Sequence, residues 1–189
     1  MGTDTQGWHW GDDVVLDDRT GVVDMEGAGF EAAGKLVASV LEVALGKDGF
    51  ESRDVFFLGF GQGGMVALSL AEAFGERDLG GMISIGAGLP SSKSAMGKVK
   101  EALNLPPSQG KARTPVLLCG GNRGTAVTAA VLSEVKARFE TVQYVKWQRE
   151  GDGMMRSREE VLPVMKFLAS RLRMPAPQGT EEVGSAAMR

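Results

Sequence analysis

The chain has 189 residues, of which 43% are hydrophobic and 24% charged, with a net charge of −3 and a pI near 5.3. That length and composition fit one globular domain with a buried core and exclude a disordered or fibrous chain. The slight negative charge gives no electrostatic reason to expect nucleic acid or an anionic membrane as a partner.

The sequence contains one cysteine, Cys119, and one histidine, His9. A single thiol cannot build a disulfide framework or a cysteine-rich metal cluster, and one imidazole cannot build a His-rich site. We therefore predict neither a metal nor a cofactor. The first residues lack a basic start and an apolar segment, and no run approaches the ~20 apolar residues of a membrane span. These features favour a cytoplasmic protein without a membrane span.

The first half of the chain alternates between helical and extended patterns. Residues 1–27 are polar and rich in Gly and Asp, and we predict an irregular segment there. Apolar residues at helical spacing predict a helix over 28–45 that ends near Gly46. An apolar run predicts a buried strand over 54–59, and a stretch rich in Ala, Leu and Met predicts a helix over 62–75.

The second half continues the alternation. Short apolar runs predict three further strands, the last of them at a sheet edge, over 80–85, 114–119 and 141–147. Helical spacing predicts helices near 94–103, 125–139 and 157–173. The charged run that opens the last helix, from Arg156 to Glu160, is typical of an exposed surface.

Strands that alternate with helices predict an α/β fold, in which a parallel sheet is joined by right-handed crossovers and flanked by helices. The folded domain is expected to span 28–173. Residues 174–189 carry Pro, Gly, Glu and Ser without periodicity, and we predict a disordered tail there.

The junction between the strand over 54–59 and the next helix carries the most informative motif. It runs from Gly59 to Gly64 and reads GFGQGG. This is the outline of a nucleophile elbow, the strand-to-helix turn G-x-S-x-G that presents a catalytic serine. Gly61 stands where the serine would be, so the turn lacks its attacking atom.

These residues resemble the phospholipase/carboxylesterase/acyl-protein thioesterase family of the α/β-hydrolases, whose elbow reads GFSQGG. Three later segments extend the resemblance over roughly 28–173: a strand end that reads GAGLP at 86–90, the strand TPVLLCGG at 114–121, and the loop GDGM at 151–154. The resemblance implies an α/β-hydrolase fold and an ancestral hydrolysis of carboxylic esters or thioesters.

The resemblance also assigns the three catalytic positions. The serine position is Gly61, the acidic position is Gly124 and the histidine position is Met154. Hydrolysis by a triad needs a hydroxyl to attack, an imidazole to take its proton and a carboxylate to orient the imidazole. None of the three side chains supplies its group, and we predict a catalytically degenerate copy, a pseudoenzyme.

Part of the substrate-binding machinery can persist without the triad. By the resemblance, Gln62 and Gly63 lie where the oxyanion hole is built, at the start of a helix whose dipole favours negative charge. This position could still hold an acyl carbonyl or carboxylate, so we predict binding of a hydrophobic or acyl small molecule. The alternative is that these amides only begin a helix.

The family pattern places further strands before the part matched here, and residues 1–27 are too few to supply them. We therefore expect the N-terminal strands to be missing and one edge of the sheet to be open. An open parallel sheet is a liability unless it is covered. This predicts a protein partner or a homodimer at that edge, or else a fragment with marginal stability.

Two other functions stay open at this stage. Gly59, Gly61 and Gly64 also satisfy the dinucleotide-binding pattern G-x-G-x-x-G, although the next strand does not end in the acidic residue that holds the ribose. An esterase with a rearranged site would have to use Ser84 or Cys119 with His9. Buried cysteines at strand ends usually belong to the core, and His9 between two tryptophans fits an aromatic plug or contact surface.

Overall fold

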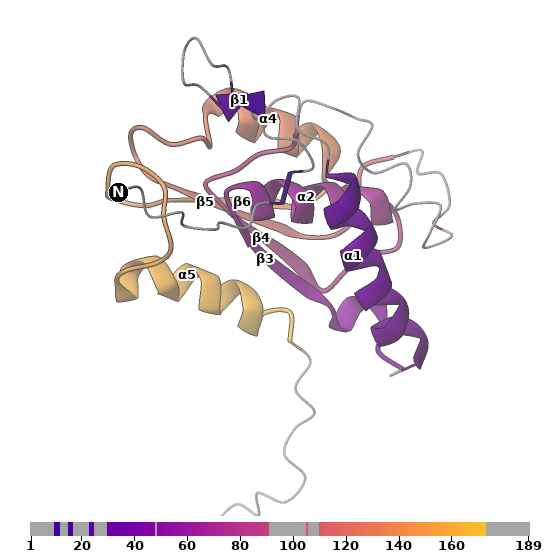
Figure 1. Ribbon diagram of the computed structural model, residues 1–189. Coiled ribbons are helices and arrows are strands. Elements are labelled where there is room, and N and C mark those ends of the chain that lie inside the picture. Colours follow the sequence, from indigo (N-terminus) through magenta and orange to yellow (C-terminus); the bar gives the residue numbers. More distant parts are fainter. Residues whose placement is uncertain are drawn as a thin grey trace, which may run out of the picture.

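The computed structural model describes residues 10–11, 15–16, 23–24, 30–47, 49–90, 105 and 110–172. A four-stranded sheet forms the centre of this part of the chain (Figure 1). All of its neighbouring strands are parallel, in the order β3-β4-β5-β6. Their bounds are Phe56–Phe60 for β3, Gly81–Ile85 for β4, Val116–Gly120 for β5 and Val142–Lys146 for β6.

The position of each strand in the sheet explains its burial. Every residue of β4 and β5 is buried because these strands lie between two neighbours and under helices. The outer strands β3 and β6 are only partly buried. The four predicted strands and the edge position of the last one are therefore confirmed.

Helices cover both faces of the sheet. α2 (Gln62–Phe74) and α4 (Ala129–Arg138) lie on one face, and α1 (Glu31–Glu42) packs beside α2 (Figure 1). Among the described helices, α5 (Arg158–Ala169) is the one on the opposite face (Figure 1). The predicted α/β-hydrolase-like arrangement, a parallel sheet with flanking helices, is confirmed.

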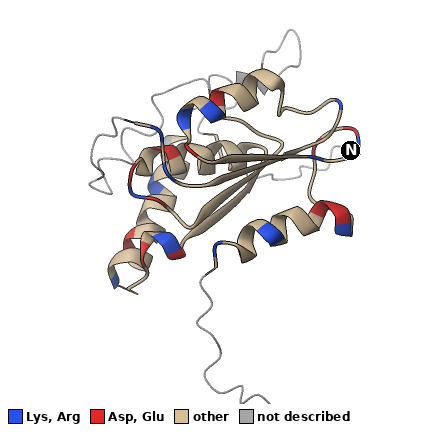
Figure 2. Ribbon diagram, turned by 180° about the vertical axis from the view of Figure 1, so that it is seen from behind, with Lys and Arg blue, Asp and Glu red and all other residues tan. Residues whose placement is uncertain are grey.

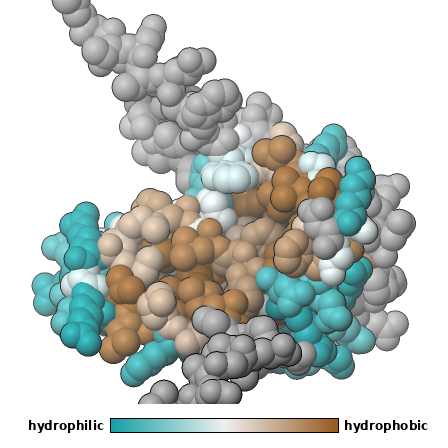
Figure 3. Space-filling model, turned by 90° about the horizontal axis from the view of Figure 1, so that it is seen from below, coloured by the Kyte–Doolittle hydropathy of each residue, from teal (hydrophilic) through white to brown (hydrophobic). Residues whose placement is uncertain are grey.

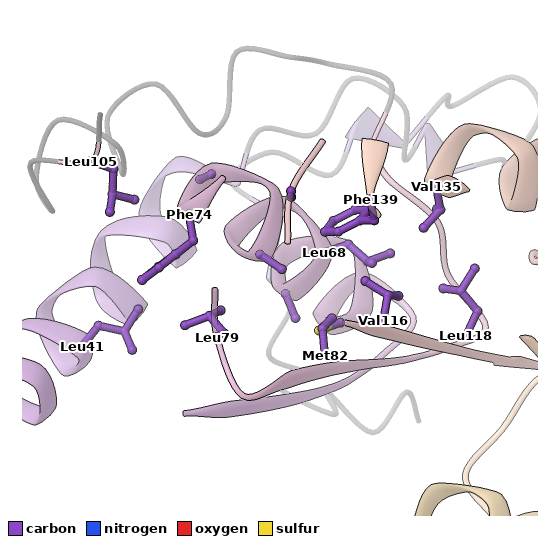
Figure 4. Close-up of a cluster of buried hydrophobic side chains, with 14 of the residues drawn as sticks. Leu41, Leu68, Phe74, Leu79, Met82, Leu105, Val116, Leu118, Val135 and Phe139 are labelled. Carbon is purple, nitrogen blue, oxygen red and sulfur yellow. The ribbon is translucent and has the colours of Figure 1, made fainter. Parts of the chain in front are cut away.

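Side chains from alternate strand positions build two cores. Met82, Val116 and Leu118 point toward α2 and α4, where they pack with Leu68 and Val135 (Figure 4). The intervening residues point the other way and pack against α5; they are Ile83, Ile85, Leu117 and Cys119, together with Trp147, Val164 and Phe167. This alternation follows from the two-residue period of a strand.

Side chains of Thr128 and Ser157 begin the last two helices. Thr128 Oγ1 accepts a hydrogen bond from the N–H of Val131, and Ser157 Oγ accepts one from the N–H of Glu160. α1 differs from the prediction at its end, because it continues through Gly46 into a π-helical turn, Val43–Lys47. The glycine with positive φ lies later, at Gly49, so the predicted stop at Gly46 was wrong.

The amino-terminal part contains a short antiparallel pair that the sequence did not predict, β1 (Val15–Leu16) with β2 (Val23–Asp24). Most of the segment 1–27, the predicted helix near 94–103 and the predicted tail 174–189 lie outside the described residues. Among the helices that the structure does describe, none has the length and apolar character needed to cross a membrane.

Candidate functional site

Gly61 forms the sharp turn between β3 and α2. Its backbone has φ 53° and ψ −124°, a left-handed conformation that favours glycine. Its N–H donates to the carbonyl of Ile85 at 3.0 Å, which ties the turn to the end of β4. Its own carbonyl accepts from the N–H groups of Gly64 and Met65, which begin the helix. The predicted elbow is thus present as strand, tight turn and helix.

The glycines that flank the turn allow the strand and the helix to pack closely against each other. A Cβ on Gly59 would lie 2.3 Å from the carbonyl oxygen of Gly63, and one on Gly64 would lie 2.7 Å from Ser84 Oγ. Strand and helix therefore approach at distances that only glycine allows. At Gly61, by contrast, no atom beyond the two neighbouring residues of the chain lies within 4 Å of the Cβ position. The space that a serine side chain would use is open.

Trp10 lies over the start of α2, where Gln62 and Gly63 form the first turn. Its backbone N–H donates to Gln62 Oε1 at 3.2 Å. Its indole Nε1 lies 3.4 Å from where a Cβ on Gly63 would be. The predicted oxyanion residues are thus placed beside the elbow and under an indole ring. Trp10 belongs to the aromatic cluster around His9, and His9 itself lies outside the described residues.

Gly124 lies in the loop that follows β5. Its φ is 56°, and a Cβ there would lie 3.9 Å from Glu150 Cγ and from the backbone nitrogen of Gly151. The same loop pairs with the one after β6, since the N–H of Gly151 donates to the carbonyl of Arg123 at 2.8 Å. Gly124, which the resemblance assigns to the acidic position, is therefore held next to the loop that contains Met154.

Met154, which the resemblance assigns to the histidine position, lies in the loop after β6 and is 46% exposed. Arg149 holds this loop through Nη2, which donates to the carbonyls of Gly153 and Met154 at 2.6 and 3.2 Å. The same guanidinium forms an ion pair with Glu160, Nε to Oε1 at 2.9 Å. Arg156, Arg158 and Glu159 are exposed as predicted for this charged run, whereas Glu160 is only 8% exposed.

Asp152 is the residue of this region that sequence reasoning missed. Its Oδ1 accepts hydrogen bonds from Gly121 N–H at 3.1 Å and Thr125 Oγ1 at 2.7 Å, and its Oδ2 accepts from Ala126 N–H at 2.7 Å. Its Cβ also lies 2.5 Å from where a Cβ on Gly86 would be. The carboxylate thus joins the loop after β6 to the loop after β5, and the Asp152 side chain packs closely against Gly86 after β4. The only signal in the sequence is an acid between two glycines.

A strand, a tight turn and a helix thus form an elbow, and comparison with known protein families identifies the family to which the chain belongs. The model of the Phospholipase/Carboxylesterase family matches residues 1–169. The chain belongs to this family.

One curated protein and two solved structures are also similar to this chain. An uncharacterized hydrolase of Schizosaccharomyces pombe is 38% identical over 86 residues, which are 45% of this chain and 34% of that protein. A point variant of SOBER1 from Arabidopsis thaliana is 21% identical with a TM-score of 0.56, covering 74% of this chain and 64% of that one. A phospholipase/carboxylesterase from Dyadobacter fermentans is 22% identical with a TM-score of 0.54, covering 72% and 62%.

The two solved structures establish the fold alone, since both are below 25% identity. The chain spans about a third of the curated relative and less than two thirds of each solved structure. Gly59, Gly61 and Gly64, which also match the dinucleotide-binding pattern, all belong to the elbow of this family member. The next strand, β4, ends at Ile85 and is followed by Gly86, with no acid to hold a ribose.

The two alternative nucleophiles of a rearranged phospholipase/carboxylesterase site are both in the core. Ser84 is fully buried, and its hydroxyl donates to the carbonyl of Ala87 at 3.0 Å. Cys119 is fully buried on the α5 side of the sheet, and burial raises the pKa of its thiol to about 12. A thiol with that pKa holds its proton at neutral pH, so it is a poor nucleophile.

An apolar groove of about 420 Å³ begins at the elbow of this family member. It runs along β3 between α1 and α2, and its lining residues are Trp10, Val37, Phe57, Leu58, Gly59, Phe60, Gly63, Val66, Ala67 and Leu70. A larger cavity of about 640 Å³ lies at the amino ends of the strands, bordered by Arg53 and Asp78. Parallel sheets bind ligands at the carboxyl ends of their strands, so the smaller groove is the candidate site.

Proposed function

We propose that this chain is a non-hydrolytic member of the Phospholipase/Carboxylesterase family that binds an apolar ligand or protein segment in the groove beside the elbow. The observation that carries the proposal is Gly61, which keeps the elbow backbone and has no nucleophile. Gly124 and Met154 stand at the positions of the acid and the base. A triad that lacks the hydroxyl, the carboxylate and the imidazole has no route to a covalent acyl intermediate.

The proposed binding surface combines two features. The groove is lined mostly by apolar side chains, which suits an acyl chain or an apolar peptide side chain. Its lining includes Gly63 in the first turn of α2, where the helix dipole favours a carbonyl or carboxylate oxygen. Gln62 and Gly63 thereby keep a binding role without a catalytic one. A cytoplasmic location is part of the proposal, because the one cysteine suits a reducing compartment.

Hydrolysis assays on purified protein test the catalytic half of the proposal. The substrates are p-nitrophenyl butyrate and a long-chain acyl thioester, and the samples are the natural chain and Gly61→Ser. A cooperative thermal melt is recorded first for each sample, so that only folded protein is assayed. We expect no turnover above buffer from either one. Gly61→Ser should stay inactive because position 154 still lacks an imidazole to take the serine proton.

Turnover by the natural chain would overturn the proposal if it follows the enzyme through purification and vanishes on unfolding. In that case Ser84→Ala and Cys119→Ala would identify the nucleophile of a rearranged site. The dinucleotide alternative has its own readout, a rise in melting temperature with NAD at a hundredfold excess over its dissociation constant, about 2.7 kcal/mol in stability.

A further inference from the structure

The indole ring of Trp10 covers the first turn of α2. Its Nε1, Cδ1 and Cε2 atoms lie 3.4, 3.8 and 3.9 Å from where a Cβ on Gly63 would be. These are ordinary van der Waals distances, so the space between the ring and the helix would take one methyl group. A carbonyl group with its substituents is larger than a methyl group, and it cannot enter while the ring is in this place.

The residue under the ring carries a backbone donor without a partner. The carbonyl of Gly61 accepts from the N–H groups of Gly64 and Met65. The N–H of Gly63 has no acceptor among the described residues, which is typical of a donor in the first turn of a helix. The head group of the proposed ligand would use this donor. The ring of Trp10 and a ligand oxygen at Gly63 therefore compete for one place.

The groove and the covered turn are continuous, because Trp10 and Gly63 line the groove together with Val66 and Leu70. Gly63 and Leu70 are two turns apart on α2, so the groove extends about 10 Å along the helix at about 1.5 Å per residue. An extended carbon chain advances about 1.25 Å per carbon, so about eight carbons span this length. The strand beside the groove, β3, has no charged residue (Figure 2). An apolar chain of this length would bring its head group to Gly63.

The main chain of Trp10 is anchored, and its ring is not. The backbone N–H donates to Gln62 Oε1 at 3.2 Å, whereas the indole N–H has no acceptor in the part of the chain that the structure describes. The side chain is 45% exposed. Side chains move between staggered rotamers, so a change of χ1 would lift the ring off Gly63 while the bond to Gln62 stays.

We infer that Trp10 is a built-in plug of the groove, whose indole ring and the head group of a ligand exclude each other at Gly63. A ligand with an apolar chain of about eight carbons binds only when the ring has turned to another rotamer. The inference rests on the proposed function in taking the groove as the ligand site, and it adds how that site is regulated. It does not depend on the absence of hydrolysis.

Nuclear Overhauser effects (NOEs) in the full chain test the contact itself. In the free protein, the indole protons of Trp10 should show NOEs to the α-protons of Gly63, because ring atoms lie over this residue. Saturation with sodium octanoate should abolish these NOEs. The NOEs between Trp147 and Val164 are the internal control, since both residues are buried in the core on the α5 side, and they should persist.

Isothermal titration calorimetry with sodium octanoate tests the competition, after a cooperative thermal melt has been recorded for each protein. Trp10→Ala removes the ring and should bind at least tenfold more tightly than the natural chain. The reason is that the apparent dissociation constant equals the intrinsic one divided by the open fraction. Trp10→Phe keeps an aromatic ring over Gly63 and should bind within threefold of the natural chain.

Met165→Ala is the matched control for the loss of an exposed apolar side chain. Met165 is 55% exposed and lies on α5, across the sheet from α2. The face that carries α5, seen from below in Figure 3, is also rich in apolar side chains. Because Met165 does not line the groove, Met165→Ala should bind octanoate as the natural chain does.

Equal affinities of the natural chain and Trp10→Ala would overturn the inference and leave the proposed function standing. So would weaker binding by Trp10→Ala, which is the result expected if the ring were only a wall of the groove. Binding of octanoate with the NOEs from Trp10 to Gly63 intact, or a free protein without these NOEs, would also overturn it. No binding by any of the folded proteins would overturn the proposed ligand, and with it the role of Trp10 as its plug.

Discussion

Replacement of Asp152 is the sharpest test of how the site is held together. The carboxylate accepts three hydrogen bonds, two at Oδ1 and one at Oδ2, from a loop 26 to 31 residues earlier in the chain. Asp152→Ala removes all three and leaves the N–H of Gly121 without its acceptor in a buried position. Asp152→Asn keeps the size of the side chain and one oxygen, so the Gly121 and Thr125 bonds can survive while an amide group faces the N–H of Ala126.

The size of the effect follows from the kind of bond. Hydrogen bonds to a charged group contribute about 1.5–3 kcal/mol each. The three bonds do not add fully, because the exposed Ala126 N–H can turn to water. We expect a loss of about 3 kcal/mol for Asp152→Ala and about 2 kcal/mol for Asp152→Asn. For a domain of this size, 3 kcal/mol lowers the melting temperature by about 6–12 °C.

Urea denaturation with circular dichroism measures both losses. Glu150→Ala is the control, since it removes an exposed carboxylate two residues away and should change the free energy of unfolding by less than about 0.5 kcal/mol. The reasoning fails if Asp152→Ala is as stable as Glu150→Ala. It also fails if Asn is worse than Ala, because the retained oxygen would then be of no value.

Three further predictions use single residues as probes. Burial first, then the charges of Asp152 and Cys119, raise the pKa of Tyr144, which is the only tyrosine of the chain. An absorbance titration at 295 nm should therefore find a lower pKa in Asp152→Asn than in the natural chain; an equal pKa would contradict the structure. Cys119 should resist Ellman's reagent at pH 8 until the protein is unfolded, because burial raises the pKa of its thiol to about 12. The unfolded thiol ionises near pH 8.5, so Cys119 lowers stability progressively as pH rises from there toward 12; rapid labelling of the native protein would disprove its burial. Gly61→Ala should cost about 1–3 kcal/mol, through backbone conformation alone. Gly59→Ala should cost more, because its Cβ meets the Gly63 carbonyl, and equal losses in thermal melts would refute that distinction.

The sequence predicted what depends on short-range patterns. The strands were visible as apolar runs bounded by glycine, and the elbow as glycines at fixed spacing on either side of position 61. The end of α1 was misplaced because Gly46 fits within a helix, and the chain turns only at Gly49. Sequence spacing alone could not separate these two glycines.

The parts that could not be predicted depend on contacts between distant segments. Asp152 finds its partners in a loop after a different strand, and nothing local distinguishes it from a solvated acid. Glu160 belongs to a charged run, and its burial follows from Arg149, eleven residues earlier. Trp10 reaches the elbow over 52 residues of sequence. Each of these is a tertiary pairing that periodicity does not encode.

The open space at Gly61 makes the elbow a position where a reporter group can be attached. A cysteine introduced there would have room for its side chain and would lie at the amino end of α2, where the helix dipole lowers a thiol pKa. Cys119 is fully buried, so it need not be removed for selective labelling. A spin label or cross-linker at this one position would report directly on whatever enters the groove beside it.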